Sequence, residues 1–233
     1  DCGPIPAPNP TPPVRSAELD GDCARIAGRL QRAHRPLLLA GTGVRLAGAE
    51  HTLLHFAEAH GIPVCTAWTH DIIASDHPLF AGRPGTIGTR AGNICTQNAD
   101  CVIVVGSRLN IRQVSYNWSS FAQHAFIAQI DIDPAELAKP FVQPDLRVAA
   151  DAGAFLDGLT AACAGGLPDF SSWATWCRDI SQRYPTGGLA PNGPQLHPYA
   201  LVERVFSQLR DDDIIVCGNA SACILPFQVG QLK

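Results

Sequence analysis

Two apolar runs of this sequence end in residue types that are suited to binding a nucleotide. The runs cover residues 101–105 and 125–130. The first continues into Gly106, Ser107 and Arg108, and the second continues into Asp131, Ile132 and Asp133. An unbroken apolar run is typical of a parallel strand that helices cover on both faces. Because open α/β sheets bind ligands at the carboxyl ends of their strands, we expect a nucleotide-binding crevice here.

The charged side chains at these two strand ends have alternative roles. The Arg108 guanidinium can pair bidentately with a phosphate, or it can form a salt bridge with Asp131 or Asp133. The two acids flank one residue and therefore share a face of an extended segment. An acid at a strand end can accept the hydroxyl groups of a ribose, whereas an acid before Pro134 can cap a helix. We expect one acid to bind a nucleotide and the other to cap the helix.

A glycine-rich turn follows an earlier apolar run at 36–40, and it consists of Gly41, Thr42 and Gly43. It is either a tight turn that needs the conformational freedom of glycine or a place where backbone amides approach a pyrophosphate. Leu46 stands where the G-x-G-x-x-G motif of dinucleotide sites requires its last glycine. This departure disfavours a standard NAD site.

A second glycine-rich loop contains Gly82, Gly85 and Gly88 and precedes a helix that we expect to end near Ala99. Such a loop is common in flexible crossovers between elements. Its position beside other loops at strand ends favours contact with a phosphate or a ribityl group.

Composition and charge narrow the class of protein. Of the 233 residues, 46% are hydrophobic and 16% are charged, which is ordinary for a globular protein. A net charge of −4 gives no reason to expect nucleic acid or an anionic membrane as a partner, and no apolar run is long enough to span a bilayer. The nine cysteines include no CxxC pair, and no Cys or His cluster has the spacing of a zinc site. Cys65, Cys101 and Cys217 lie inside apolar runs, so we expect reduced thiols in a cytoplasmic protein.

Alternating strand and helix patterns predict an α/β fold. We expect a doubly wound, Rossmann-like parallel sheet with helices on both faces, followed by a truncated second α/β domain. One helix is expected between Gly43 and Gly61, and a strand of the second domain is expected at 213–217. The expected divisions are a proline-rich linker at 1–18, a central domain at 19–165, a connector containing a helix at 166–197, and the start of the second domain at 198–233.

Several segments resemble, in order, the central domain of thiamine-diphosphate-dependent enzymes of the acetolactate synthase and pyruvate oxidase group. They are Arg35–Val44, Gly61–Val64, His77–Phe80, Gly82–Gly88, Ala99–Arg108 and Gln129–Pro134. Together they cover roughly residues 20–165. Residues 198–221 are similar to the start of the C-terminal, diphosphate-binding domain of the same family. The order of the segments makes the resemblance specific, although each segment alone is a weak signal.

The resemblance implies an enzyme that depends on thiamine diphosphate and Mg²⁺, decarboxylates a 2-oxo acid, and transfers or oxidises the product. Some family members hold FAD in the central domain. Such a dinucleotide would lie near Gly41, Thr42, Gly43, Gly85, Gly88, Gly106, Ser107, Arg108, Asp131, Ile132 and Asp133. The phosphates of thiamine diphosphate would contact Gly218, Asn219, Ala220 and Ser221. Family members are usually homodimers or homotetramers, so the resemblance also implies an oligomer.

Two parts of the family's active site have no counterpart in this chain. The catalytic glutamate belongs to an N-terminal domain, and the Gly-Asp-Gly motif that binds magnesium does not occur here. The chain also contains no methionine. We therefore expect a segment of a longer carboligase or decarboxylase that is inactive by itself. The alternative is a stand-alone nucleotide-binding or regulatory module without catalysis. An NAD-dependent dehydrogenase or a sirtuin-like deacylase would fit the sheet, but the dinucleotide motif and the zinc cysteines are missing.

Overall fold

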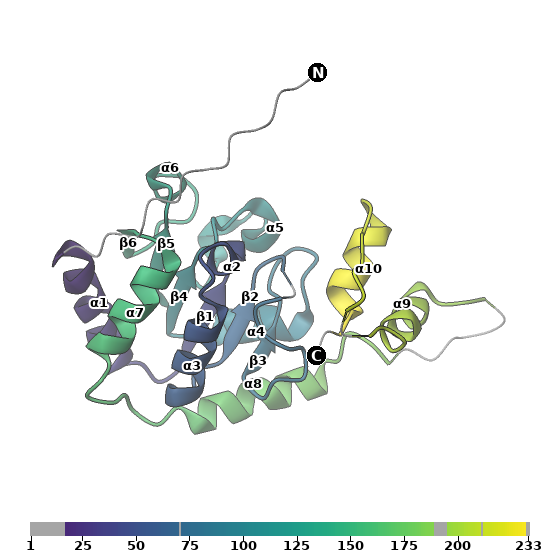
Figure 1. Cartoon of the computed structure of the whole chain (residues 1–233), viewed down its shortest axis with the longest axis horizontal. Coiled ribbons are helices and arrows are strands. Elements are labelled where there is room, and N and C mark those ends of the chain that lie inside the picture. Colours follow the sequence, from purple (N-terminus) through teal and green to yellow (C-terminus); the bar gives the residue numbers. More distant parts are fainter. Residues whose placement is uncertain (1–16, 70, 189–194, 211, 232–233) are drawn as a thin grey trace, which may run out of the picture.

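Six parallel strands form the sheet at the centre of the fold (Figure 1). The computed structural model describes residues 17–231 except 70, 189–194 and 211, so nearly all of the expected linker at 1–18 lies outside the described residues. The order along the sheet is β3-β2-β1-β4-β5-β6. The strands are β1 (Pro36–Ala40), β2 (Val64–Thr66), β3 (Phe80–Gly82), β4 (Cys101–Val105), β5 (Phe126–Asp131) and β6 (Leu146–Ala149). This is the doubly wound order, in which the winding reverses between β1 and β4, and it confirms the predicted fold class.

Helices cover both faces of the sheet (Figure 1). Successive strand residues alternate between two hydrophobic clusters, with Leu38 and Ile103 in one and Leu37 and Val102 in the other. The first cluster includes α1 (Ala17–Leu30), α3 (Glu50–His60) and α7 (Ala152–Ala162), and the second includes α4 (Arg90–Asn98) and α8 (Ser171–Arg183). Because both faces are buried, the strands appear in the sequence as unbroken apolar runs.

The single helix expected after β1 is divided into two, α2 (Thr42–Leu46) and α3. The chain turns at Gly48, which has a φ of +63°, and the amide of Ala49 donates to the carbonyl oxygen of Val44 over 3.0 Å. A φ in this range favours glycine over other residues. The prediction of one continuous helix is therefore wrong at this point.

The helix predicted to follow the second glycine-rich loop and to end near Ala99 is present as α4, whose C-cap is Ala99. Gly82 ends β3, a three-residue strand that the sequence pattern did not indicate, and α4 begins at Arg90, two residues after Gly88. A Cβ atom on Gly82 would lie 2.5 Å from the Thr89 hydroxyl oxygen and 2.9 Å from the amide nitrogen of Gly92. Thr89 caps α4 by accepting a hydrogen bond from the Gly92 amide over 3.1 Å. The glycine thus allows the strand end and the helix start to pack backbone to backbone.

The helix predicted in the segment 166–197 is present as α8, and it packs on the sheet domain. Its buried side chains are Trp173, Cys177 and Ile180. The indole Nε1 of Trp173 donates a hydrogen bond to the carbonyl oxygen of Pro36 over 2.8 Å. This contact ties α8 to the first residue of the central strand β1.

The C-terminal part contains α9 (Pro198–Phe206) and α10 (Ser221–Val229), which contact each other (Figure 1). The strand predicted at 213–217 does not form. Ile214 and Val216 are 87% and 90% exposed, and Cys217 is exposed as well. A strand needs a neighbouring strand to pair its backbone groups, and the described residues supply none here. In contrast, Cys65 and Cys101 lie buried in β2 and β4 as expected.

Within the described residues, no helix is both long and apolar enough to cross a membrane.

Candidate functional site

The register of the sheet brings the predicted strand ends together. Ala40 pairs with Val105, and Val105 pairs with Ile130. The residues that follow these positions are Gly41, Gly106 and Asp131. They therefore lie side by side at the carboxyl edge of the sheet, where the winding reverses between β1 and β4. This is where doubly wound proteins bind their ligands.

Three glycines at this edge allow the ends of β1 and β4 to touch. A Cβ atom on Gly41 would lie 2.3 Å from the carbonyl oxygen of Gly106, and one on Gly43 would lie 2.6 Å from the Cα atom of Gly106. The amide of Gly41 donates to Val105, and the amide of Gly43 donates to Gly106. Two amides that could have approached a pyrophosphate are thus used within the protein. The amides of Thr42 and Ser107 donate to no group in the described part of the chain.

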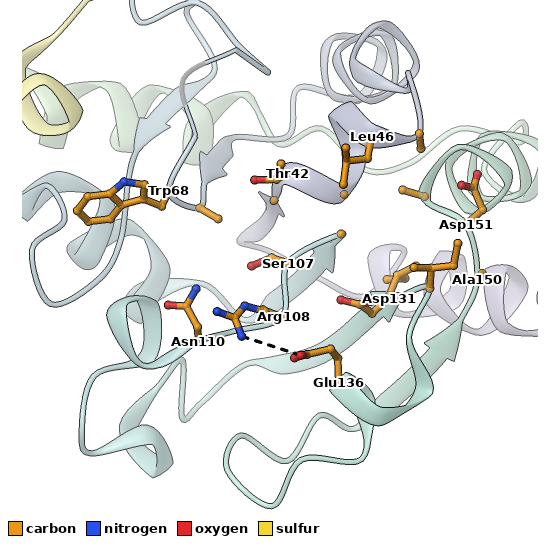
Figure 2. A pocket seen from close by; sticks show the side chains of 18 residues that line it. Thr42, Leu46, Trp68, Ser107, Arg108, Asn110, Asp131, Glu136, Ala150 and Asp151 are labelled. Carbon is orange, nitrogen blue, oxygen red and sulfur yellow. Dashed lines mark ion pairs between the residues drawn. The ribbon is translucent and has the colours of Figure 1, made fainter. Parts of the chain in front are cut away.

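A crevice of about 490 Å³ opens above these strand ends, and we call it the central crevice. Figure 2 shows it with Trp68 at one end and Asp151 at the other, and with Thr42, Ser107 and Asp131 between them. It is lined by Gly41, Thr42, Gly43, Leu46, Ala47, Ala67, Trp68, Gly106, Ser107, Arg108, Asn110, Ile130, Asp131, Ile132, Glu136, Ala150, Asp151 and Ala152. Eight of the residues predicted for a dinucleotide site are among them.

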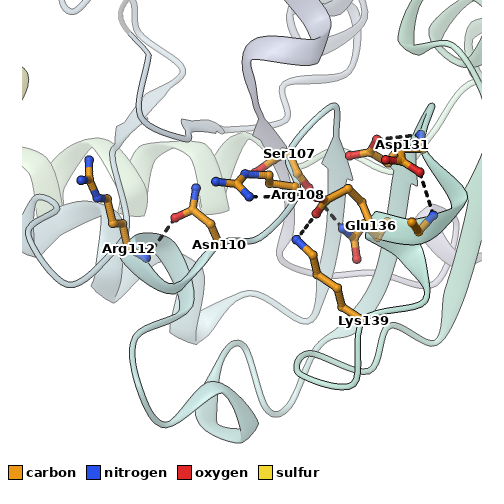
Figure 3. Close-up of polar contacts among 10 residues, drawn as sticks. Ser107, Arg108, Asn110, Arg112, Asp131, Glu136 and Lys139 are labelled. Carbon is orange, nitrogen blue, oxygen red and sulfur yellow. Dashed lines mark hydrogen bonds and ion pairs between the residues drawn. The ribbon is translucent and has the colours of Figure 1, made fainter.

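Arg108 has a different acidic partner from the two that the sequence suggested. Its Nη1 lies 4.0 Å from Oε1 of Glu136, which belongs to the short helix α6 (Pro134–Leu137). Glu136 also pairs with Lys139 (Figure 3). The Arg108 side chain remains 60% exposed. Its guanidinium therefore stays accessible to a ligand from the crevice, beside the Glu136 carboxylate at the crevice wall.

Asp133 has the capping role that the sequence suggested for one of the two acids. Asp133 caps α6, because its Oδ1 accepts a hydrogen bond from the Ala135 amide over 2.8 Å, and it does not line the central crevice. Asp131 lines the crevice and accepts from the Asp133 amide through one carboxylate oxygen, Oδ1, over 3.0 Å. Its other oxygen, Oδ2, accepts no hydrogen bond from the described residues. The predicted capping role is confirmed for Asp133, and the nucleotide role stays a prediction for Asp131.

Ser107 is buried, and its hydroxyl takes part in a polar network below the crevice floor. The hydroxyl donates to Oε1 of Gln113 over 3.0 Å, and Gln129 donates to the Ser107 carbonyl oxygen over 3.2 Å. Gln113 belongs to the short helix α5 (Ile111–Val114), and its buried Nε2 has no partner among the described residues. The network fixes the backbone of Ser107, so the backbone amide is better placed than the hydroxyl to contact a ligand.

Gly85 and Gly88 do not line the central crevice. A Cβ atom on Gly85 would lie 2.4 Å from the Arg112 carbonyl oxygen, and one on Gly88 would lie 2.2 Å from the Arg83 carbonyl oxygen. The Thr86 amide donates to the same Arg112 carbonyl over 2.7 Å. These glycines therefore have a packing role that the sequence did not reveal. Their predicted contact with a cofactor has no support in this geometry.

A second cavity, of about 220 Å³, lies between the sheet domain and the start of α10. It is lined by Trp68, Thr86, Ile87, Ile111, Arg112, Tyr116, Asn219, Ala220, Cys223 and Ile224. Two residues of the loop predicted to contact thiamine diphosphate are among them, Asn219 and Ala220. The guanidinium of Arg112 stacks over the Trp68 ring at 5.3 Å from its centroid and has no acidic partner in the described residues. The cavity therefore offers one unneutralised positive charge opposite this loop.

A column of stacked side chains fastens α10 to the sheet domain. The rings of Trp68 and Phe227 are 3.9 Å apart and nearly parallel, at 5°. The guanidinium of Arg83 also lies over Phe227, 5.5 Å from the ring centroid. Burial lowers the pKa of the Arg83 guanidinium to about 10. Gln228 adds a polar contact, since its Nε2 donates to the Ile87 carbonyl oxygen over 2.7 Å.

The loop that leads into α10 has donors suited to a diphosphate. The first backbone bonds of α10 run from Cys223 and Ile224 to the Ala220 carbonyl oxygen, at 3.0 and 2.9 Å. The amides of Ser221 and Ala222 donate to no group in the described residues, and Ser221 is exposed. Free amides of this kind are suited to an anion. No group of three or more His, Cys, Asp or Glu side chains in the described residues could hold a metal ion.

Among the lining residues of the two cavities that sequence reasoning missed are Trp68, Arg112, Glu136 and Asp151. Trp68 follows β2 by two residues, so the rule that located the other strand ends would have found it. Asp151 follows β6 and caps α7 by accepting from the Ala154 amide over 3.0 Å. Glu136 and Arg112 lie on short helices, for which no local pattern signals contact with a ligand.

Comparisons with known proteins agree with this geometry. Residues 23–159, more than half of the chain, match the family described as thiamine pyrophosphate enzyme, central domain. The chain is 38% identical over 151 residues to the probable acetolactate synthase large subunit of Methanocaldococcus jannaschii, a match that covers 64% of this chain and 25% of that protein. It is 32% identical over 215 residues to the acetolactate synthase large subunit of Corynebacterium glutamicum, covering 91% and 33%. It is 35% identical over 159 residues to the sulfoacetaldehyde acetyltransferase of Rhodobacter capsulatus, covering 66% and 25%. The matched regions thus make up a quarter to a third of each of these relatives.

Proposed function

Because the chain belongs to the family of thiamine pyrophosphate enzymes and carries their central domain, we propose that it is part of an acetolactate synthase-like carboligase or decarboxylase of 2-oxo acids. The relatives that support this proposal include acetolactate synthase large subunits from an archaeon, bacteria and plants. The match to the Corynebacterium glutamicum protein extends over 91% of the chain, which supports a common arrangement beyond the central domain.

The second cavity is the observation that carries the proposal. In our proposal Asn219, Ala220 and Ser221 hold the diphosphate of thiamine diphosphate through backbone amides and the Ser221 hydroxyl. When bound, this cofactor supplies the carbon nucleophile for decarboxylation and carboligation. Arg112 faces the same cavity without an acidic partner in the described residues and is suited to bind the carboxylate of a 2-oxo acid. The apolar wall of the cavity, which includes Ile111, would exclude water from the bound substrate.

The central crevice is proposed as the site of an adenine nucleotide. Such a ligand would be the adenosine diphosphate portion of FAD in flavin-containing relatives of this fold. Asp131 would accept the ribose hydroxyls through its free carboxylate oxygen. The amides of Thr42 and Ser107 and the Arg108 guanidinium would bind the phosphates.

Other parts of the enzyme are expected from outside this chain. The described residues contain no cluster that could hold Mg²⁺. The catalytic glutamate and the Gly-Asp-Gly motif of the family have no counterpart in the sequence. We therefore propose that the isolated chain is inactive and that the complete polypeptide works as a homodimer or homotetramer in the cytoplasm.

Replacing Arg112 in the complete polypeptide tests the proposed function. A charge-assisted hydrogen bond contributes about 1.5–3 kcal/mol, so Arg112→Gln should raise the KM for the 2-oxo acid on the order of 10- to 100-fold. Arg90 offers a matched control, because it is also exposed and stacks over an aromatic ring, at 4.5 Å from the Tyr184 centroid. Arg90→Gln should leave KM unchanged. Equal effects of the two substitutions would contradict the assignment of Arg112.

The alternative role, a nucleotide-binding module without catalysis, makes an opposite prediction. The complete polypeptide would then bind an adenine nucleotide but would not consume a 2-oxo acid in the presence of thiamine diphosphate and Mg²⁺. A decarboxylation assay on that polypeptide distinguishes the two proposals, and absence of turnover would refute the enzymatic one.

A further inference from the structure

We propose that a further cavity, at the amino edge of the sheet, binds an aromatic carboxylate, that is, a flat ring that carries one negative charge. The cavity has a volume of about 420 Å³, and we call it the amino-edge cavity. It is lined by His34, Arg35, Asn98, Ser172, Trp173 and Trp176. None of these residues lines the central crevice or the second cavity, so the site is independent of the proposed function.

The amino-edge cavity lies at the opposite edge of the sheet from the proposed cofactor sites. Pro36 and Cys101 are the first residues of β1 and β4, and they pair with each other. His34 and Arg35 directly precede Pro36, whereas the central crevice follows the last residues of the same two strands. The other wall comes from the start of α8, the helix that Figure 1 shows at the end of the fold away from α6. A ligand bound here would therefore be distinct from those proposed for the carboxyl edge.

Two stacked tryptophans form one wall of the amino-edge cavity. The rings of Trp173 and Trp176 are 4.9 Å apart and inclined by 15°. Trp173 is buried, and its indole N–H donates to the Pro36 carbonyl oxygen over 2.8 Å, so the inner ring is fixed in place. The outer ring, that of Trp176, remains 36% exposed. A flat aromatic ring against this wall would remove the outer indole from water and extend the stack.

Arg35 supplies the positive charge of the amino-edge cavity. Its Nε donates to the Asn98 carbonyl oxygen over 2.6 Å, and its backbone amide donates to Oδ1 of Asp100 over 2.9 Å. These two bonds hold the side chain in place, while Nη1 and Nη2 donate to no group in the described part of the chain. Two parallel N–H groups of a guanidinium match the two oxygens of a carboxylate.

No acidic side chain among the described residues lines the amino-edge cavity. Asp100, the carboxylate that contacts this segment, uses both oxygens for backbone amides, since Oδ2 accepts from His34 over 2.9 Å and Oδ1 accepts from Arg35. The His34 imidazole, the Ser172 hydroxyl and the Asn98 side-chain amide line the cavity and are groups that can donate a hydrogen bond. One guanidinium among further donors favours a single carboxylate over a neutral ligand or a diphosphate.

The two walls together define the ligand by its chemistry. The exposed face of Trp176 selects a planar ring, and the Arg35 guanidinium selects a carboxylate. An aliphatic carboxylate would lack the stacking contact, and an uncharged aromatic compound would lack the ion pair. Phenylacetate has both parts, whereas cyclohexylacetate lacks the flat ring and phenylacetamide lacks the charge. The three compounds therefore separate the two contacts.

Nuclear magnetic resonance of the isotope-labelled full chain with phenylacetate tests the proposal. The four tryptophans give indole N–H signals that single substitutions assign. We expect phenylacetate to shift the Trp176 signal with a Kd on the order of 1 mM, as suits a ligand of about ten heavy atoms. The Trp68 signal should stay in place, because Trp68 lines only the cavities of the carboxyl edge. Phenylacetamide should bind about 10- to 100-fold more weakly, and cyclohexylacetate about 2- to 10-fold more weakly.

Three results of this titration would overturn the proposal. The first is an unmoved Trp176 signal at a phenylacetate concentration about tenfold above the expected Kd. The second is a shift of the Trp68 signal without one of Trp176, which would place the ligand at the carboxyl edge. The third is equal binding by phenylacetate and phenylacetamide, which would exclude the ion pair.

Matched substitutions assign the two contacts. Arg35→Gln should weaken phenylacetate binding about 10- to 100-fold. Arg32→Gln is the control, because Arg32 is exposed, lies close in sequence and does not line the cavity. Trp176→Leu should weaken binding about 2- to 10-fold, measured on the resonances of the ligand. Its control is Trp118→Leu, because Trp118 is 37% exposed and also contacts an aromatic ring, that of Phe141 at 4.8 Å. Equal effects of a substitution and its control would refute the contact in question and with it the proposal.

Discussion

Substitution of Gly106 by alanine should destabilise the protein far more than the same substitution at Gly48. The two glycines have nearly identical φ angles, +61° and +63°. A Cβ atom on Gly106 would lie 2.7 Å from the Cα atom of Gly43 and 2.7 Å from the amide nitrogen of Val44. A Cβ atom on Gly48 would meet no atom within 4 Å. The pair therefore separates the cost of crowding from the cost of the left-handed conformation.

The expected magnitudes follow from these contacts. A left-handed conformation costs a residue other than glycine about 1–2 kcal/mol, and this cost applies to both variants. At Gly106 the new atom also overlaps the backbone of Gly43 and Val44 in α2, which can yield only if α2 and the end of β4 move apart. Overpacking of this kind costs a further ~1–3 kcal/mol. We expect a loss of about 2–5 kcal/mol for Gly106→Ala and about 1–2 kcal/mol for Gly48→Ala.

Urea unfolding followed by circular dichroism measures both losses. The free energy of unfolding of a small protein falls by about 1–3 kcal/mol per molar urea. The unfolding midpoints of the two variants should therefore differ by roughly 1 M urea. Gly106→Ala should also weaken nucleotide binding, because the amide of Gly106 donates to Ile130 and its carbonyl accepts from Gly43 at the crevice floor. Equal losses of stability in the two variants would refute the argument from close backbone packing.

Two further predictions concern stability. Gly28 lies inside α1, and a Cβ atom on it would meet no atom within 4 Å. Gly28→Ala should therefore raise the free energy of unfolding, measured in urea, by about 0.5–1 kcal/mol. A lower free energy of unfolding would contradict the inference that a methyl group fits there. Burial, with a smaller contribution from Asp100, raises the pKa of the Cys101 thiol to about 12. In the unfolded chain this thiol ionises above about pH 8.5, whereas in the folded protein it stays neutral up to about pH 12. Between these two pH values the Cys101 thiol therefore lowers the free energy of unfolding by about 1.4 kcal/mol per pH unit. Urea unfolding at a series of values between about pH 8 and about pH 11 should give a shallower pH slope for Cys101→Ala, and an unchanged slope would contradict the assignment.

The central crevice could be predicted from the sequence because its signals are local. Apolar runs mark the buried strands, and the residues that follow each run must lie at the carboxyl edge if the strands are parallel. The structure places Gly41, Gly106 and Asp131 side by side through the pairing of β1, β4 and β5. The pairing itself could not be predicted, because no local pattern specifies which strands are neighbours.

The glycine-rich loop with Gly82, Gly85 and Gly88 has a packing role that the sequence did not reveal. Gly82, Gly85 and Gly88 have the spacing of a phosphate-binding loop, yet each is required because another part of the protein occupies the space of its Cβ atom. A glycine at a close backbone approach and a glycine at a ligand look the same in a sequence. Only the position of the second segment, such as the carbonyl of Arg112 beside Gly85, distinguishes the two.

In the C-terminal part, a strand was predicted that does not form. The run 213–217 has the composition of a buried strand, but strand formation requires a neighbour, and Ile214 and Val216 remain exposed. The helix α8 was predicted from its amphipathic pattern, but the surface on which it packs could not be predicted. The hydrogen bond from Trp173 to Pro36 spans 137 residues, and long-range contacts of this kind leave no trace in a local pattern.

Trp68 lines both cavities and shows both what a local pattern reveals and what it does not. Its position two residues after β2 follows the same rule as the other strand ends, so its place at the crevice was open to prediction. Its place between the two cavities was not, because the indole stacks at 3.9 Å on Phe227, which lies 159 residues further along the chain. A sequence can therefore indicate that a crevice exists at the carboxyl edge of a sheet. The position of the Trp68 ring in that crevice depends on a contact between two distant segments, which no local pattern reveals.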